Sequence, residues 1–274
     1  MNNPTAISVY VTSGKSSDQR VQIACALAQA MDARLCGIGC EYISAMTFAN
    51  GPVSKRLLQL ECARVEQELA KRQRRFSELV LGKARKIEWR GSSDYSLKAF
   101  ADQLRATDLL VLGPDSKVLA ESHFNPATII LQAGRPVLFV PDNSKNVTLN
   151  RILIAWKDSR ESRRALADSL PYLKKAKDTL LLGVRENEQS KKQIEGILSD
   201  VSNYLAHHGI PCKMKAVRPA KQTAAKEILS QAKNFKPGLI VAGAYGRSRV
   251  GEWVFGGVTK TLLETSSCAC LFSH

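Results

Sequence analysis

The sequence has no long hydrophobic run and no paired cysteine motif. No apolar stretch approaches the roughly 20 residues that a membrane-spanning helix needs, so we expect no membrane span. A Cys-x-x-Cys pair is missing, and the four histidines complete no metal-ligand spacing, so we predict no metal site. Cys36 and Cys40 with a remote histidine stay open as an alternative. The cysteines are expected to be small buried thiols in a reducing compartment: Cys25, Cys36, Cys40, Cys62, Cys212, Cys268 and Cys270.

Signals for export and for catalysis are also missing. The first residues carry no basic segment followed by an apolar one, which does not indicate secretion, so we expect a cytoplasmic location. The chain lacks Gly-x-Ser-x-Gly, His-Glu-x-x-His and the Gly-Lys-Ser/Thr ending of a P-loop. We therefore do not expect an enzyme, or at most a weak ATPase.

Acidic residues are scarce relative to basic ones. The 40 Lys and Arg against 25 Asp and Glu give a formal charge of +15, which favours anionic partners. The alternative is a solvated helix face, because Lys71, Arg72, Arg74 and Arg75 fall in a helical pattern beside glutamates. Aromatic residues do not interleave with the basic ones, so we predict no specific nucleic-acid binding.

Strand and helix patterns alternate twice along the 274 residues. In the first half, strands are expected at 7–12, 34–40, 86–89, 108–112 and 136–140, with helices at 18–31, 55–81, 95–104 and 126–132. In the second half, strands are expected at 151–155, 179–184, 213–217, 239–242 and 268–272. The helices between them are expected at 161–173, 193–208 (ended by Gly209), 224–233 and 259–265.

This alternation, with strands that are apolar throughout, predicts an α/β fold of two tandem doubly wound five-stranded parallel-sheet domains. We place the domains at 1–143 and 150–274, joined by a polar linker. Such a duplication favours a pseudo-dimer within the chain and allows a further homodimer.

A glycine loop follows the apolar run 239–242. It reads Gly243-Ala-Tyr-Gly246, nine residues, then Gly256-Gly257-Val258-Thr259, and a helix begins near its end. Glycine lets backbone N–H groups approach an anion, and a helix N-terminus adds its own N–H groups. The loop therefore favours phosphate binding; the alternative is a plain turn between strand and helix.

The glycine loop with Val258-Thr259, together with Ile152-Leu-Ile-Ala-Trp156-Lys157-Asp158-Ser159 and Gly134-Arg-Pro-Val-Leu138, resembles the universal stress protein family. The resemblance covers the whole chain as two successive domains. It implies ATP or AMP as ligand, with Mg²⁺ accompanying ATP. The implied adenine side is Ala155, Trp156, Lys157 and Val184, and the implied phosphate side is Gly243, Tyr245, Gly246, Arg247, Gly256, Gly257, Val258 and Thr259.

The chain departs from the family pattern at two positions of this site. Gly257 stands where the family has Ser or Thr, and Lys157 stands where it has an Asp or Asn that reads the adenine edge. Asp158 could replace the missing acceptor if the loop shifts by one residue. The first half departs further: Ser13-Gly14-Lys15-Ser16-Ser17 and Pro114 replace its loops, so we expect a degenerate domain without a nucleotide in the usual mode.

The resemblance implies a cytoplasmic stress-response protein. Its second domain would bind the adenine nucleotide and act as a sensor or as an interaction module for other proteins. Two alternatives stay open: a scaffold that has lost its ligand, and a slow ATP hydrolase.

Overall fold

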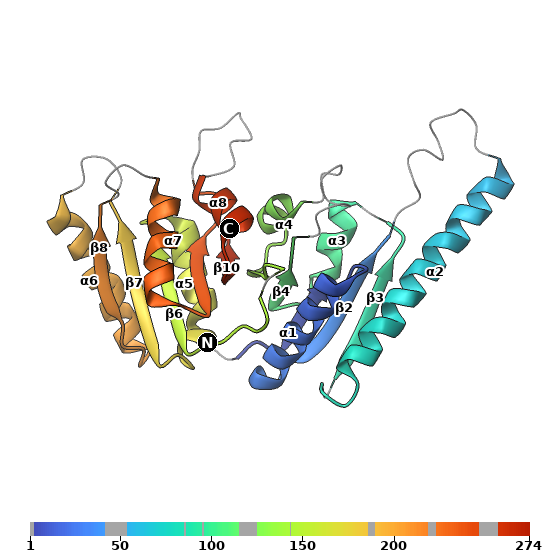
Figure 1. Ribbon diagram of the computed structural model, residues 1–274, viewed down its shortest axis with the longest axis horizontal. Helices are drawn as coiled ribbons and strands as arrows, with labels where there is room; N and C mark the ends of the chain where they lie inside the picture. Colours follow the sequence, from blue (N-terminus) through green and yellow to red (C-terminus); the bar gives the residue numbers. More distant parts are fainter. Residues whose placement is uncertain are drawn as a thin grey trace. The chain divides into compact units, whose positions relative to one another are not determined.

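The computed structural model describes residues 3–41, 54–84, 86–94, 96–114, 125–142, 144–185, 190–218, 223–246 and 257–274. The chain divides into two compact units, Pro4–Phe124 and Asn125–His274, the latter together with residues 1–3. Across these ranges strands and helices alternate, which confirms the expected α/β fold (Figure 1). Among the helices described, none combines the length and the apolar character needed to cross a bilayer.

The Pro4–Phe124 unit contains a parallel sheet with strand order β3-β2-β1-β4. Strands β1 and β4 are buried along their whole length, as expected for a sheet covered on both faces. The bounds are β1 Ala6–Tyr10, α1 Lys15–Met31, β2 Arg34–Cys40, α2 Lys55–Val80, β3 Ile87–Ser92, α3 Leu97–Gln103 and β4 Leu109–Leu112.

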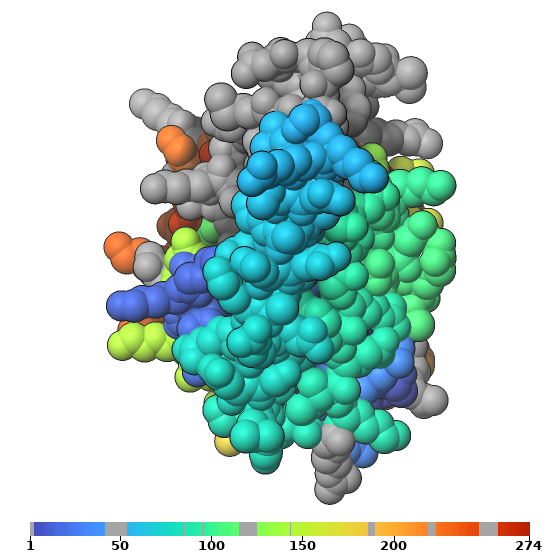
Figure 2. All heavy atoms as spheres, turned by 90° about the vertical axis from the view of Figure 1, so that its right-hand side faces the viewer, coloured from blue at the N-terminus to red at the C-terminus, as the bar shows by residue number. Residues whose placement is uncertain are grey.

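Helix α2 runs along the outside of this unit (Figure 2). Its second half buries Phe76 against the ring of Trp89, with ring centroids 5.7 Å apart. Its first turns are less buried than the apolar stripe in the sequence indicates, since Leu57 and Leu58 are 42% and 39% exposed. The stripe is therefore buried from Val65 onwards and not in the first turns of the helix.

The Asn125–His274 unit contains the strand order β5-β10-β9-β6-β7-β8. All neighbours are parallel except β5 and β10, which pair antiparallel. The bounds are α4 Pro126–Gln132, β5 Val137–Phe139, β6 Arg151–Trp156, α5 Arg160–Leu173, β7 Asp178–Val184, α6 Lys191–His207, β8 Lys213–Val217, α7 Ala224–Phe235, β9 Leu239–Gly243, α8 Gly257–Thr265 and β10 Ala269–Ser273.

Strand β5 comes from the sequence repeat of the first half but pairs with the last strand of the second. Phe139 lies opposite Cys270, and α4 contacts α8. For this reason the compact units divide the chain at residue 125, inside the predicted first domain, and one strand pair departs from the all-parallel expectation. The predicted boundaries at 143 and 150 follow the sequence repeat and stay a prediction.

The helices of the Asn125–His274 unit form two layers, with α5 and α6 on one face of the sheet and α7 and α8 on the other (Figure 1). This arrangement follows from right-handed crossovers that leave β6 and β9 in opposite directions. The two central strands therefore form a switch point in strand order, where a crevice opens at their carboxyl ends.

Candidate functional site

A cavity of about 170 Å³ lies at the carboxyl ends of β6 and β9. Of the twelve site residues predicted from sequence, ten fall within the described ranges, and all ten line this cavity; Arg247 and Gly256 lie outside those ranges. The structure thus brings together Ala155, Trp156, Lys157, Val184, Gly243, Tyr245, Gly246, Gly257, Val258 and Thr259. Their role in binding a ligand stays a prediction.

Five further residues line the cavity that the sequence analysis did not assign to it: Ser159, Ser162, Ala224, Ile228 and Ala242. The two serines belong to the start of α5, where the Ser159 hydroxyl accepts a hydrogen bond from the Ser162 backbone N–H at 3.2 Å. A Ser-x-x-Ser pair directly after a buried strand is the signal that could have identified them. Because α5 begins here, the positive end of its dipole adds to the cavity.

Gly243 is required by packing. A Cβ at this position would lie 2.5 Å from the Ser162 backbone nitrogen and 2.7 Å from the Glu161 carbonyl carbon. The first turn of α5 can therefore approach β9 closely only because residue 243 has no side chain. The glycine thus brings the start of α5, with its two serine hydroxyls, to the edge of the cavity.

The two ends of the glycine loop are joined by a hydrogen bond. The Tyr245 backbone N–H donates to the Thr259 hydroxyl oxygen at 3.3 Å. Tyr245 has a φ of 55°, in the left-handed region that non-glycine residues rarely adopt. Thr259 is 3% exposed, so its hydroxyl is an interior anchor that holds β9 and the first turn of α8 in register.

No protein-family profile and no curated protein matches the chain. Solved structures do match. A universal stress protein from Archaeoglobus fulgidus DSM 4304 aligns at a TM-score of 0.69 and 13% identity, covering 98% of this chain and 97% of that chain. A functionally unknown protein from Pseudomonas aeruginosa PAO1 aligns at a TM-score of 0.58 and 16% identity, covering 98% of this chain and 92% of that chain.

The chain has the tandem universal stress protein fold. At these identities the likeness concerns the fold, and the chemistry of the site has to be argued from this chain's own residues.

Within this universal stress protein fold, the segment after β6 does not show the one-residue shift that would bring Asp158 into the cavity. Asp158 forms an ion pair with Arg163 at 2.5 Å and does not line the cavity. The side chain that does line it here is Lys157, which is exposed. Asp158 is therefore directed to α5 in this structure, and its suggested part as the replacement acceptor stays a prediction.

Trp156 ends β6 and is 8% exposed. Its indole N–H is buried and has no hydrogen-bond acceptor among the described residues. A buried donor without an acceptor costs about 1–3 kcal/mol. An acceptor supplied by a ligand at this end of the strand would remove that cost.

A buried carboxylate lies beside the glycine loop. Glu161 is 1% exposed, and its Oε2 would be 3.1 Å from a Cβ at Gly246. Burial by itself raises the pKa of this carboxyl, but hydrogen bonds from Arg160, from its own backbone N–H and from Ser159 together hold the pKa below its usual value. The group is therefore an anion at neutral pH, next to the loop that is expected to meet phosphate.

In the first half, the segment between β1 and α1 is packed differently from the segment between β6 and α5. Gly14 precedes α1 with a φ of 104°. Arg20 is 2% exposed; its Nε donates to the Tyr10 carbonyl at 2.9 Å and its Nη2 to the Thr12 hydroxyl at 3.2 Å. A guanidinium thus lies under the end of β1; counted from the helix start, Arg20 of α1 corresponds to Ala165 of α5.

Within the described ranges, no three His, Cys, Asp or Glu side chains are close enough together to hold a metal ion. At this edge Asp158 is paired with Arg163, and Glu161 is paired with Arg160.

Proposed function

We propose that the second half of this chain binds an adenine nucleotide, ATP or AMP, in the cavity at the carboxyl ends of β6 and β9. The observation that carries the proposal is the convergence of four separate segments on one cavity at the switch point in strand order: the end of β6, the end of β7, the end of β9 and the start of α8. Crevices at this position are where doubly wound sheets bind ligands.

The cavity has an apolar end and an end lined by backbone N–H groups. Val184, Ile228 and Ala155 are apolar and suit the faces of an adenine ring. Gly257 and Val258 offer backbone at the start of α8, where unpaired N–H groups and the helix dipole favour a phosphate, and Gly246 offers backbone after β9. The serine hydroxyls at the start of α5 add hydrogen-bonding groups between these ends.

The affinity is expected to be modest. Lys157 offers no acceptor to the adenine edge, Gly257 offers no hydroxyl, and the Glu161 carboxylate repels phosphate charge. Because each missing hydrogen bond costs about 1–2 kcal/mol, we expect a Kd on the order of tens to hundreds of micromolar. The function that follows is that of a sensor or interaction module that responds to the concentration of the nucleotide. A role in stress response and a cytoplasmic location stay predictions.

One specific observation favours a second candidate, a scaffold without a ligand. The cavity of about 170 Å³ is smaller than the roughly 300–1,000 Å³ of most ligand pockets. In this case the interior packing around Gly243 and Thr259 would serve stability alone.

A thermal-shift titration distinguishes the two. If ATP, ADP or AMP binds only the folded chain, the Tm rises with ligand concentration, by an amount that corresponds to about 2.7 kcal/mol at a hundredfold excess over Kd. No rise for any of the three at roughly a hundred times the expected Kd would favour the scaffold.

A further inference from the structure

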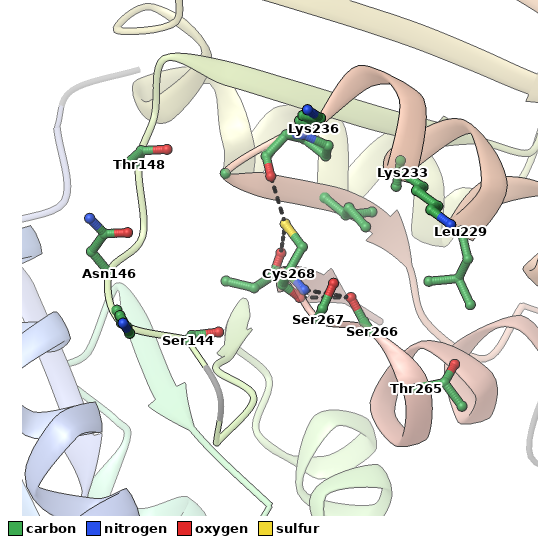
Figure 3. A pocket seen from close by; sticks show the side chains of 16 residues that line it. Ser144, Asn146, Thr148, Leu229, Lys233, Lys236, Thr265, Ser266, Ser267 and Cys268 are labelled. Carbon is green, nitrogen blue, oxygen red and sulfur yellow. Dashed lines mark hydrogen bonds between the residues drawn. The ribbon is translucent and has the colours of Figure 1, made fainter.

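A second and larger cavity, of about 700 Å³, lies at the opposite edge of the same sheet, where β9 and β10 begin. Figure 3 shows the 144–148 segment on one side, α7 with Leu229 and Lys233 on the other, and the end of α8 with Thr265 below. Its volume falls within the range of about 300–1,000 Å³ typical of small-molecule sites. We refer to it as the amino-edge groove.

The amino-edge groove has walls held in place by close packing. The 144–148 segment contacts Gly238, the residue before β9, so closely that a Cβ there would lie 2.0 Å from the Thr148 carbonyl oxygen. The floor is fixed by the Ser266 hydroxyl, which donates to the Cys268 carbonyl at 2.7 Å, and by the Cys268 thiol, which donates to the Pro237 carbonyl at 3.2 Å. These contacts hold Thr148 against Gly238 and fix residues 266–268 against Pro237 at the base of the groove.

The charge of the lining is positive. Lys145, Lys233 and Lys236 line the groove, and no Asp or Glu is among the lining residues. In the described part of the chain none of these three ammonium groups forms an ion pair. Lys233 and Lys236 also offset the partial negative charge at the end of α7. Lys145 lies on a segment without a helix, so helix capping does not explain its position.

Hydrogen-bonding groups stand beside the lysines. The side chains of Asn146, Thr148 and Ser267 line the groove and make no hydrogen bond to other described residues. Figure 3 shows Asn146 and Thr148 on one side of the hollow and Lys233 and Lys236 on the other. Lys145 belongs to the 144–148 segment, on the side of Asn146 and Thr148. An ammonium group on each side favours a compact anion between them, and uncommitted hydroxyl and amide groups favour a ligand that carries hydroxyls.

We propose that the amino-edge groove binds a small hydroxylated phosphate ester, of the chemical class of sugar phosphates. Lys145 and Lys233 approach the phosphate from opposite walls, and Asn146, Thr148 and Ser267 bond the hydroxyls. The apolar side chains of Leu229 and Ile240 cover the carbon skeleton. This site is separate from the cavity at the carboxyl edge and does not depend on nucleotide binding there.

The test uses the full chain and glucose 6-phosphate as the probe in a thermal-shift titration at constant ionic strength. We expect the Tm to rise with glucose 6-phosphate but not with glucose. Lys233→Gln/Lys236→Gln should weaken the apparent Kd at least tenfold, and Lys145→Gln should weaken it without lowering the Tm of the free protein. The matched control is Lys174→Gln/Lys175→Gln, which removes two exposed lysines from the end of α5 and should leave the Kd unchanged.

Four results would overturn the proposal. One is no rise in Tm with glucose 6-phosphate. Another is a rise of the same size with citrate or sulfate, which would indicate the general stabilising effect of excluded anions. The third is equal weakening in the control variant. The last concerns Thr259→Val, in the carboxyl-edge cavity, which should leave glucose 6-phosphate binding unchanged. A loss of glucose 6-phosphate binding in this variant would show that the probe binds in the carboxyl-edge cavity and not in the amino-edge groove.

Discussion

The backbone N–H of Tyr245 donates a hydrogen bond to the hydroxyl of Thr259 at 3.3 Å, across fourteen residues of sequence. This contact fixes the distance between the end of β9 and the start of α8. It gives Thr259 a structural role in the glycine loop, in addition to any bond that its hydroxyl hydrogen donates to a ligand.

Thr259→Val should therefore destabilise the loop and weaken nucleotide binding. The substitution keeps the shape but leaves the Tyr245 N–H without its acceptor, which costs about 1–3 kcal/mol of unfolding free energy. We expect a roughly tenfold higher Kd for ATP, equivalent to ~1.4 kcal/mol, measured by isothermal titration calorimetry. Thr259→Ser keeps the hydroxyl and should retain most of the affinity; equal losses in both variants would contradict the role given to this bond.

Gly243→Ala should destabilise the fold because its Cβ would be 2.5 Å from the Ser162 nitrogen, a backbone atom that cannot rotate away. Overpacking of this kind costs about 1–3 kcal/mol, which urea denaturation would measure. The matched control is Gly196→Ala in the exposed middle of α6, where nothing lies within 4 Å. That variant should gain about 0.5–1 kcal/mol, since alanine is the better helix former. A neutral Gly243→Ala would show that α5 does not press on β9.

Glu161 should give a pH-dependent contribution to stability. Its folded pKa lies below its usual value, so the ionised group contributes fully above the unfolded pKa of about 4.3 and loses that contribution as the pH falls through the folded pKa. The difference in unfolding free energy between wild type and Glu161→Gln should therefore be constant near neutral pH and shrink below about pH 4.3. A difference that shifts in favour of the wild type as the pH falls would mean that burial dominates and the pKa is raised.

Lys157→Asn should strengthen nucleotide binding. The side chain at 157 is exposed and lines the carboxyl-edge cavity, so an amide oxygen can be introduced there without disturbing the core. One added acceptor for the adenine edge is worth about 0.5–1.5 kcal/mol, a two- to tenfold lower Kd. Lys157→Ala removes the charge without adding an acceptor and should show no such gain. If both variants behave alike in calorimetry, residue 157 does not meet the adenine edge.

Features that depend on residues close together in the sequence could be predicted from it. The long apolar periodicity predicts a helix at 55–81, and the structure has α2 at Lys55–Val80. Gly209, predicted to follow a helix end, has the positive φ of 73° that this position requires. The glycine loop could be proposed from its spacing after an apolar strand, because parallel strands bring their carboxyl ends to one edge. The full set of twelve site residues could be proposed only through the resemblance to the universal stress protein family.

Features that depend on distant residues could not be predicted. Phe139 pairs with Cys270 in an antiparallel register that nothing in either short strand specifies. The packing reason for Gly243 depends on how closely α5 approaches, and the pairing of Asp158 with Arg163 depends on how α5 begins. Each is decided by tertiary contacts.

The most direct test of nucleotide binding at the carboxyl edge is a titration of the labelled chain with ATP, followed by amide resonances in NMR. We expect concentration-dependent shifts at residues 155–157, 243–246 and 257–259, with none at residues 266–269. Unchanged resonances at the first three segments, or changes confined to other parts of the chain, would contradict nucleotide binding at the carboxyl edge.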